Sequence, residues 1–312
     1  MGIRDNTFRV AVRSFGPFES AIKKQWQQFS EASIAEMQLE AVPFDLHPLH
    51  ETLFESGGLI KGEWDVAFVS TDWMAKASES GSLSDLSGFV EAEPPEGYPT
   101  AWPDSLLRMQ MLDGKILGLP YHDGPECLIY RTDLMAGEAE LPNTWEEFRA
   151  IARRLNQPND NLYGTAFAAY PDGHNTVYDF CLQLWSRGGD LFDGDGRMNL
   201  CTPQAEAALQ FYRSVVNDVA AVHPMCREFD SVKSGLAFAA GEVAMMVNWF
   251  GFAAMSETIV ESRVKGKVGV GRIPCQGGPH VSLNAYWILG IGSGSRLKEI
   301  AWKFLKHCAS VP

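Results

Sequence analysis

The first part of the chain alternates short apolar runs with longer amphipathic stretches. The apolar runs have the length and residue types of buried strands, and the amphipathic stretches have apolar residues at helical spacing. The predicted strands are 8–12, 37–42 and 65–69, and the predicted helices are 19–30, 48–56 and 71–79. Strands that alternate with helices in this way predict an α/β domain with a largely parallel sheet.

Two candidate binding residues follow strands of this predicted sheet. In parallel α/β sheets, ligands bind at the carboxyl ends of the strands, where the loops begin. Phe15 comes soon after the first predicted strand, and Asp72 comes soon after the third. A carboxylate at the position of Asp72 can also stabilise the start of a helix through the helix dipole, so both interpretations stay open.

A segment in the middle of the chain, 113–155, predicts two extended runs followed by a well-defined helix. The extended runs end at Tyr121 and Tyr130. Thr144 can cap the helix, and Glu147 stands where a capping box needs its second member. Apolar residues at helical spacing then give the helix one buried face.

The rest of the chain continues the alternation. Predicted strands cover 162–168 and 243–247, and predicted helices cover 176–187, 202–217 and 293–309. The run 236–255 is nearly long enough to cross a membrane, but Glu242 and Asn248 interrupt it. We therefore predict that this run is a buried helix leading into a strand and a loop.

Composition and charge restrict the class of protein. With 312 residues, the chain is long enough for two lobes that each have a core. A net charge of −13 argues against a nucleic-acid partner, which requires clustered Lys and Arg. The N-terminus has no signal-peptide pattern, which by itself indicates a cytoplasmic protein.

The six cysteines are dispersed along the chain and include no C-x-x-C pair. This arrangement argues against zinc and redox motifs, and it favours cysteines that are small buried side chains. One disulfide stays possible, because its pairing cannot be derived from the sequence.

Several motifs resemble those of a known family. The central segment contains D-G-K-x-x-G-L-P-Y, then L-x-Y-R-x-D-L, then P-N-T-W-E-E-F. Further matches are G-G-x-L-x-D-x-x-G at 188–196, T-P-x-x-x-x-A-L-x-F from Thr202, and A-W-x-F-L at 301–305. Together these segments resemble the bacterial family 1 extracellular solute-binding proteins, the ligand receptors of ABC importers, which include the maltose-binding protein.

The resemblance implies an α/β architecture of two lobes, the type II periplasmic-binding-protein-like fold, with a hinge and a ligand cleft between the lobes. In this prediction the first lobe comprises 1–115 and 272–312, and the second lobe comprises 116–271. Family members continue with helices that return to the second lobe. This chain stops at Pro312, so we expect either a truncated or a shortened member.

The function that the resemblance implies is solute binding for an ABC importer. The expected ligand is a sugar, an oligosaccharide or a polyol, held by hinge closure without catalysis and without a cofactor or metal. The closed form would dock on the transmembrane subunits of a permease. We accordingly expect a monomeric mature protein, periplasmic or extracellular, that associates with the membrane through its permease.

In the family, the loop after the strand that corresponds to 243–247 carries an aromatic residue that stacks on sugar rings. Asn248, Trp249 and Phe250 are the candidates here, and a core role for Trp249 stays open. Asn284 and Tyr286 stand where the family often has two glycines. The complete set of expected ligand-binding residues is Phe15, Asp72, Tyr121, Asp123, Tyr170, His174, Asn248, Trp249, Asn284 and Tyr286.

Two other classes of protein remain as alternatives. A binding protein for a metal or a small anion would use Tyr121, His122 and Asp123. A cleft enzyme acting on carbohydrate, a hydrolase or a lyase, would need carboxylates with shifted pKa values facing its cleft. The sequence contains no G-x-S-x-G, H-E-x-x-H or P-loop motif that would support an enzyme.

Overall fold

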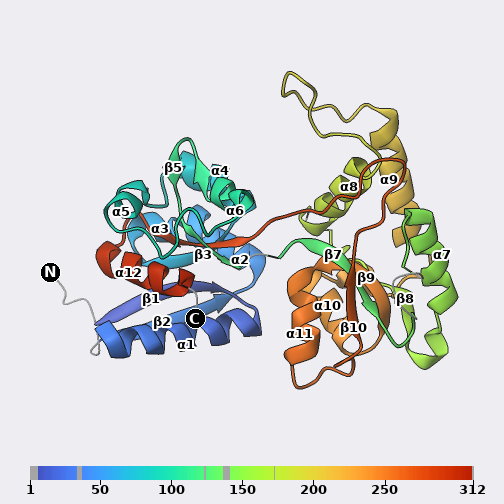
Figure 1. Cartoon of the computed structure of the whole chain (residues 1–312), viewed down its shortest axis with the longest axis horizontal. Coiled ribbons are helices and arrows are strands. Elements are labelled where there is room, and N and C mark those ends of the chain that lie inside the picture. Colours follow the sequence, from blue (N-terminus) through green and yellow to red (C-terminus); the bar gives the residue numbers. More distant parts are fainter. Residues whose placement is uncertain (1–5, 34–36, 123, 136–140, 172, 311–312) are drawn as a thin grey trace. The chain divides into compact units, whose positions relative to one another are not determined.

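The computed structural model describes residues 6–33, 37–122, 124–135, 141–171 and 173–310. The chain forms two compact units, which are labelled by element in Figure 1. Unit 1 comprises Met1–Asp123 and Ala285–Pro312, and unit 2 comprises Gly124–Asn284. The divisions therefore fall later in the chain than the predicted bounds at 115 and 272.

Backbone pairing explains why both divisions come later. The segment predicted to cross first, around Pro120, is a strand that pairs with Ile288 inside unit 1. The segment predicted to cross second packs inside unit 2, where Cys275 N donates to Asn143 O at 2.9 Å. The first of these segments therefore belongs to the sheet of unit 1, and the second belongs to a loop of unit 2.

Unit 1 is built on a five-stranded sheet with the order β2-β1-β3-β11-β6. Its strands are β1 (Thr7–Arg13), β2 (Gln38–Phe44), β3 (Val66–Ser70), β6 (Leu119–His122) and β11 (Trp287–Ile291). β1 pairs in parallel with β2 and β3, whereas β11 runs antiparallel to both β3 and β6. A strand from the end of the chain therefore lies between two strands from its first part.

The remaining elements of unit 1 are mostly short helices. They confirm the helices predicted at 19–30, 48–56 and 71–79. They are α1 (Gly16–Ser33), α2 (Leu46–His50), a π-helix (Glu51–Glu55), α3 (Gly58–Lys61), a 3-10 turn (Thr71–Trp73), α4 (Met74–Ser80), α5 (Ser87–Ala92), α6 (Asp104–Met109), β4 (Met111–Leu112), β5 (Lys115–Ile116) and α12 (Lys298–Ala309). The last helix begins at Lys298 rather than at 293, because Ser293 and Ser295 bond to the neighbouring loops instead.

Aromatic rings join helices α1 and α12 to the sheet of unit 1. Phe8 of β1 stacks on Trp26 of α1, with ring centroids 4.7 Å apart. Phe304 of α12 meets both rings edge-on, at 5.7 Å and 5.2 Å. These geometries are the favourable ones for aromatic pairs, so the three elements form one packed core.

Unit 2 is built on a four-stranded sheet with the order β10-β7-β9-β8. Its strands are β7 (Glu126–Arg131), β8 (Tyr163–Thr165), β9 (Val243–Trp249) and β10 (Val268–Gly271), and its helices are α7 (Trp145–Leu155), a 3-10 turn (Pro158–Asp160), α8 (Asn175–Trp185), α9 (Pro203–Val216), a 3-10 turn (Cys226–Glu228), α10 (Ser231–Ala239) and α11 (Phe250–Thr258). β9 pairs in parallel with β8 and antiparallel with β7.

Three helices of unit 2 begin with side-chain caps. Thr144 accepts a hydrogen bond from Glu147 N, and the Glu147 side chain accepts from Thr144 N, which confirms the predicted capping box. Thr202 caps α9 through Ala205 N at 3.1 Å. Capping satisfies backbone N–H groups that the helix itself leaves without acceptors.

Two further predictions have a clear outcome. The run 236–255 is the end of α10, the strand β9 and the start of α11, so the predicted loop after the strand is wrong. Within the described ranges, no helix combines the length and apolar character needed to cross a membrane. All six cysteines are free, so none of them forms the disulfide that the sequence left possible.

Candidate ligand-binding residues in the two units

An aromatic pair marks one end of the sheet in unit 2. Trp249, the last residue of β9, is partly exposed, and the ring of Tyr178 meets it edge-on at 5.7 Å and 90°. His174 precedes α8 and packs on Tyr178 with ring centroids 4.7 Å apart. The structure therefore links two predicted residues, His174 and Trp249, through a third ring.

Asn248 holds this end of the strand in place. Its side chain is 3% exposed, and Nδ2 donates to Ser231 O at 3.1 Å and to Ser234 Oγ at 3.0 Å. Its Oδ1 accepts from Trp249 N at 2.8 Å. Asn248 thus positions the backbone of Trp249, and its own polar atoms are already hydrogen-bonded within the protein.

Two acids, the buried Glu126 and the half-buried Asp179, lie next to the aromatic pair. Glu126 is directly opposite Trp249 in the β7–β9 register, and it is 5% exposed. Among the described residues, Glu126 Oε2 has no hydrogen-bond partner. Burial, together with the nearby Asp179 carboxylate, raises the pKa of Glu126 well above its usual value. The structure therefore favours a neutral Glu126, which can donate a hydrogen bond.

Asp179 follows Tyr178 on α8. Burial raises the pKa of Asp179 to about 7, although the hydroxyl of Tyr212 donates to its Oδ2 at 2.8 Å. This pKa rise is physically reasonable, because two carboxyl groups in one buried region cannot both ionise without repulsion. Glu126 and Asp179 consequently form a pair of acids that hold protons near neutral pH.

The other two predicted residues of unit 2 lie on connecting segments. Tyr170 is 46% exposed, and its backbone N donates to Phe229 O at 3.0 Å. Asn284 is half-buried, and its Oδ1 accepts no hydrogen bond in the described part of the chain. The Tyr170 side chain is therefore open to a ligand, whereas the Asn284 Oδ1 atom is buried.

An aromatic cluster lies near the carboxyl ends of β1 and β6 in unit 1. Phe18 of α1 is its centre, because its ring contacts the rings of Phe15 at 5.0 Å, Tyr121 at 6.0 Å, His122 at 5.0 Å and Trp287 at 6.3 Å. Two predicted residues, Phe15 and Tyr121, are therefore brought together. The position of the cluster agrees with the general rule that ligands bind where strands end.

The hydroxyl of Tyr121 donates to Gln25 Oε1 at 2.8 Å, and burial raises its pKa. A neutral hydroxyl in a hydrogen bond to an amide gives no support to an anion or metal site at this residue. Among the described residues, no group of three or more His, Cys, Asp or Glu could hold a metal. Asp123, the remaining member of that hypothesis, lies outside the described residues.

Asp72 and Tyr286 belong to neighbouring parts of unit 1. Asp72 is exposed on the 3-10 turn after β3. Tyr286 is 1% exposed, and its hydroxyl donates to Leu106 O. The backbone of Tyr286 also pairs with Thr71, which donates to Tyr286 O at 3.0 Å. Tyr286 therefore anchors the turn that carries Asp72 and is itself a core residue.

Five residues of these clusters are absent from the predicted set: Phe18, Glu126, Tyr178, Asp179 and Trp287. Tyr178 could have been found, because it lies one helical turn after His174. Glu126 could also have been noticed, since it is a charged residue at the start of an otherwise apolar strand. Nothing in the local sequence distinguishes Phe18 or Trp287 from ordinary core residues.

The chain forms two α/β units, the first from both of its ends and the second from its middle. Each unit has partly exposed aromatic residues near its strand ends, and this arrangement defines a two-lobe binding protein. The chain belongs to the family of bacterial extracellular solute-binding proteins, whose model matches residues 50–311. Proteins of this family bind solutes outside the cell. The predicted family and the predicted α/β two-lobe fold are thereby confirmed.

Individual relatives agree with this assignment. A putative binding protein of Brucella abortus (strain 2308) is 26% identical over 93% of this chain and 68% of its own length. The maltose-bound MalE3 of T. maritima superimposes with a TM-score of 0.85 and 25% identity, covering 97% of this chain and 77% of that chain. An ABC transporter solute-binding protein of Agrobacterium radiobacter K84 in complex with ribitol has the same fold, with a TM-score of 0.86, 24% identity, and coverage of 96% and 75%.

Proposed function

We propose that this protein is the substrate-binding component of an ABC importer and that its solute is a sugar or a polyol. The observation that carries the proposal is the pair of Trp249 and Tyr178, a partly exposed indole held edge-on by a second ring. The maltose and the ribitol bound by the two structural relatives support the same class of ligand.

The chemistry around Trp249 suits a neutral ligand rich in hydroxyl groups. One face of a sugar ring presents C–H groups, which an indole can cover, while polar groups take the hydroxyls. His174 can exchange hydrogen bonds with such hydroxyls, and so can the neutral carboxyl of Glu126. Neither group is a fixed charge that would require a charged solute.

In this proposal, Phe15 and Asp72 of unit 1 also contact the solute. The chain passes between the units twice, at 123–124 and at 284–285, which supports a hinge. A solute that binds the closed arrangement more tightly shifts the equilibrium toward that arrangement. The closed protein, a monomer in the periplasm or outside the cell, then docks on the transmembrane subunits of its permease.

Thermal unfolding in the presence of mono- and oligosaccharides and polyols tests the proposal. At least one of them is expected to raise the Tm, because a ligand that binds only the native state stabilises it. Trp249→Ala should weaken that binding by about fivefold or more, since stacking on an aromatic ring contributes on the order of 1 kcal/mol.

Two variants serve as controls. Trp249→Phe keeps an aromatic face and should retain part of the affinity, while Val260→Ala changes an exposed side chain of unit 2 and should retain all of it. The proposal is wrong if no sugar or polyol raises the Tm, or if Trp249→Ala binds the stabilising compound as well as the unaltered protein does.

A further inference from the structure

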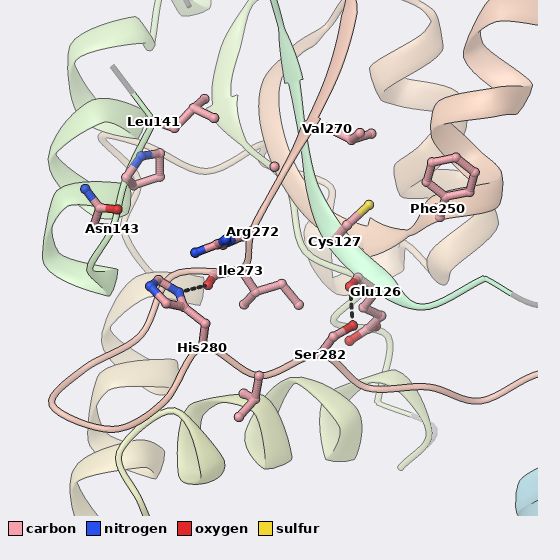
Figure 2. A pocket seen from close by; sticks show the side chains of 13 residues that line it. Glu126, Cys127, Leu141, Asn143, Phe250, Val270, Arg272, Ile273, His280 and Ser282 are labelled. Atoms are coloured by element: carbon pink, nitrogen blue, oxygen red, sulfur yellow. Dashed lines mark hydrogen bonds between the residues drawn. The ribbon is translucent and has the colours of Figure 1, made fainter. Parts of the chain in front are cut away.

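Unit 2 contains a pocket of about 980 Å³ whose lining includes neither Trp249 nor Tyr178 (Figure 2). Four segments of unit 2 form it: the start of β7, the residues before α7, the start of α11, and the chain from β10 onward. Its lining residues are Glu126, Cys127, Leu141, Pro142, Asn143, Phe250, Val270, Gly271, Arg272, Ile273, His280, Val281 and Ser282. The volume is within the range of sites that hold small organic molecules.

Hydrogen bonds between these segments fix the walls of the pocket. Glu126 N donates to Leu283 O at 2.9 Å, and Ser282 Oγ donates to Glu126 O at 2.6 Å. On the other side, Cys275 N donates to Asn143 O at 2.9 Å. The pocket is therefore built into unit 2, and its shape does not depend on a single exposed loop.

Arg272 supplies a positive charge in this pocket. Figure 2 shows its side chain lying between Asn143 and Cys127. Across the described part of the chain, its guanidinium makes no hydrogen bond and no ion pair. A guanidinium presents a planar fork of donors that matches a carboxylate, and such charge-assisted pairs are the strong ones.

Glu126 is the acid that lines the pocket, and it does not neutralise Arg272. Its side chain is 5% exposed, and its Oε2 has no partner among the residues that the structure describes. Because burial keeps the Glu126 carboxyl protonated, it adds a hydrogen-bond donor rather than a second anion. A ligand carboxylate can thus approach without repulsion.

The lining around Arg272 combines apolar and polar side chains. Leu141, Val270 and Ile273 supply apolar surface, and Val270 is 47% exposed. Asn143, His280 and Ser282 supply polar groups. We propose that this pocket binds an amphipathic organic monocarboxylate, with its carboxylate on Arg272 and its hydrocarbon part against Leu141, Val270 and Ile273.

Calorimetric titration with hexanoate, octanoate and phenylbutyrate, each beside its uncharged amide, tests this site. We expect at least one carboxylate to bind with a Kd below about 10 mM and its amide to bind at least about tenfold more weakly. Arg272→Gln should weaken carboxylate binding by about tenfold or more, because it removes the charge and keeps a polar side chain.

Matched variants separate this site from general effects. Val270→Asp places a negative charge on a half-exposed wall and should abolish binding, and Arg197→Gln removes an exposed arginine elsewhere in unit 2 and should not change it. The proposal is overturned if no carboxylate binds below about 10 mM, or if Arg272→Gln binds as well as the unaltered protein.

Discussion

The two units bury different kinds of side chain. Unit 1 has a continuous core of aliphatic and aromatic residues, and its buried acid Asp65 is fully hydrogen-bonded: Oδ1 accepts from Ser295 Oγ at 2.5 Å and Oδ2 accepts from Arg9 N at 3.0 Å. Unit 2 buries Glu126 and Asp179, whose pKa values are raised. Unit 1 should therefore respond mainly to changes in packing, and unit 2 should also respond to pH.

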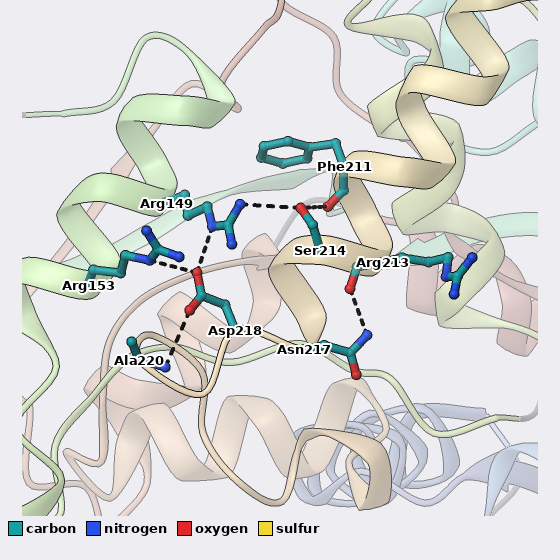
Figure 3. Close-up of polar contacts among 8 residues, drawn as sticks. All are labelled: Arg149, Arg153, Phe211, Arg213, Ser214, Asn217, Asp218 and Ala220. Carbon is teal, nitrogen blue, oxygen red and sulfur yellow. Dashed lines mark hydrogen bonds and ion pairs between the residues drawn. The ribbon is translucent and has the colours of Figure 1, made fainter.

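Ion pairs give unit 2 a second dependence on charge. Asp218 follows α9, and its side chain is 5% exposed. Figure 3 shows Arg149 and Arg153 of α7 converging on its carboxylate, with Nε atoms 2.6 Å and 2.8 Å from Oδ2. The backbone N of Ala220 donates to the other oxygen at 3.3 Å. One carboxylate thus connects α7 to the segment after α9.

The largest expected effect comes from the core of unit 1. Phe304→Ala removes a ring that contacts Phe8, Trp26 and Phe29, and it should lower the free energy of unfolding of this unit by about 3–5 kcal/mol. Hydrogen exchange measured by mass spectrometry should show faster exchange in unit 1 peptides only. Lys303→Ala, on the exposed side of the same helix, is the control. Equal acceleration in unit 2 would contradict the comparison.

A second prediction concerns the pH dependence of unit 2. Asp179 has a pKa of about 7 in the folded state and an ordinary value near 4 when unfolded, so the folded state binds a proton that the unfolded chain has released. The stabilisation is complete below about pH 4 and is lost as the pH rises through about 7, by on the order of 1 kcal/mol for each pH unit.

Urea unfolding at several pH values checks this second prediction. Asp179→Asn keeps an oxygen that can accept from Tyr212 and should flatten the pH dependence between about 4 and 7. Asp160→Asn, which alters an exposed acid of the same unit, should leave the slope unchanged. An unaltered slope in Asp179→Asn would show that Asp179 is not its source.

Removing the carboxylate of Asp218 should have a smaller effect. Asp218→Ala leaves Arg149 and Arg153 facing each other without their shared acceptor and should destabilise unit 2 by about 2 kcal/mol. Arg153→Ala should cost less than about 1 kcal/mol, because that side chain is 51% exposed and water screens its ion pair. Urea denaturation of both variants measures the difference, and similar losses would argue against the central role of Asp218.

The smallest predicted effect concerns the cap of α7. Thr144→Ala should destabilise unit 2 by about 1 kcal/mol, because Glu147 N loses its acceptor. Thr144→Ser keeps the hydroxyl and is expected to be close to neutral. Hydrogen exchange at the first turn of α7 provides a local measurement, and no change in the alanine variant would mean that packing alone holds this helix end.

Local patterns predicted most of the elements, because helix caps and strand periodicity depend on nearby residues. Thr144 and Glu147 identified the start of α7, and the alternation near the N-terminus identified β1, β2 and β3. The unit boundaries were wrong, because they depend on long-range pairing. No local pattern shows that Ile288 pairs with Pro120 inside unit 1.

The candidate site was predictable only in part. Family motifs pointed to Trp249 and to the loop before α8, but the partner ring of Tyr178 depends on how α8 packs against β9. Asn248 was selected for its polar side chain, and the structure shows that Ser231 and Ser234 already occupy that side chain. A sequence shows which polar atoms a side chain carries. The fold determines whether those atoms are available to a ligand.

The position of β11 in the sheet of unit 1 has a consequence for the order of folding. During synthesis from the N-terminus, all four strands of the unit 2 sheet emerge while the sheet of unit 1 still lacks the strand between β3 and β6. Until Trp287–Ile291 arrives, the edge of β3 has backbone groups that await a partner. The sheet that begins first in the chain is therefore the later of the two to be completed, and the nascent chain carries an open strand edge until then.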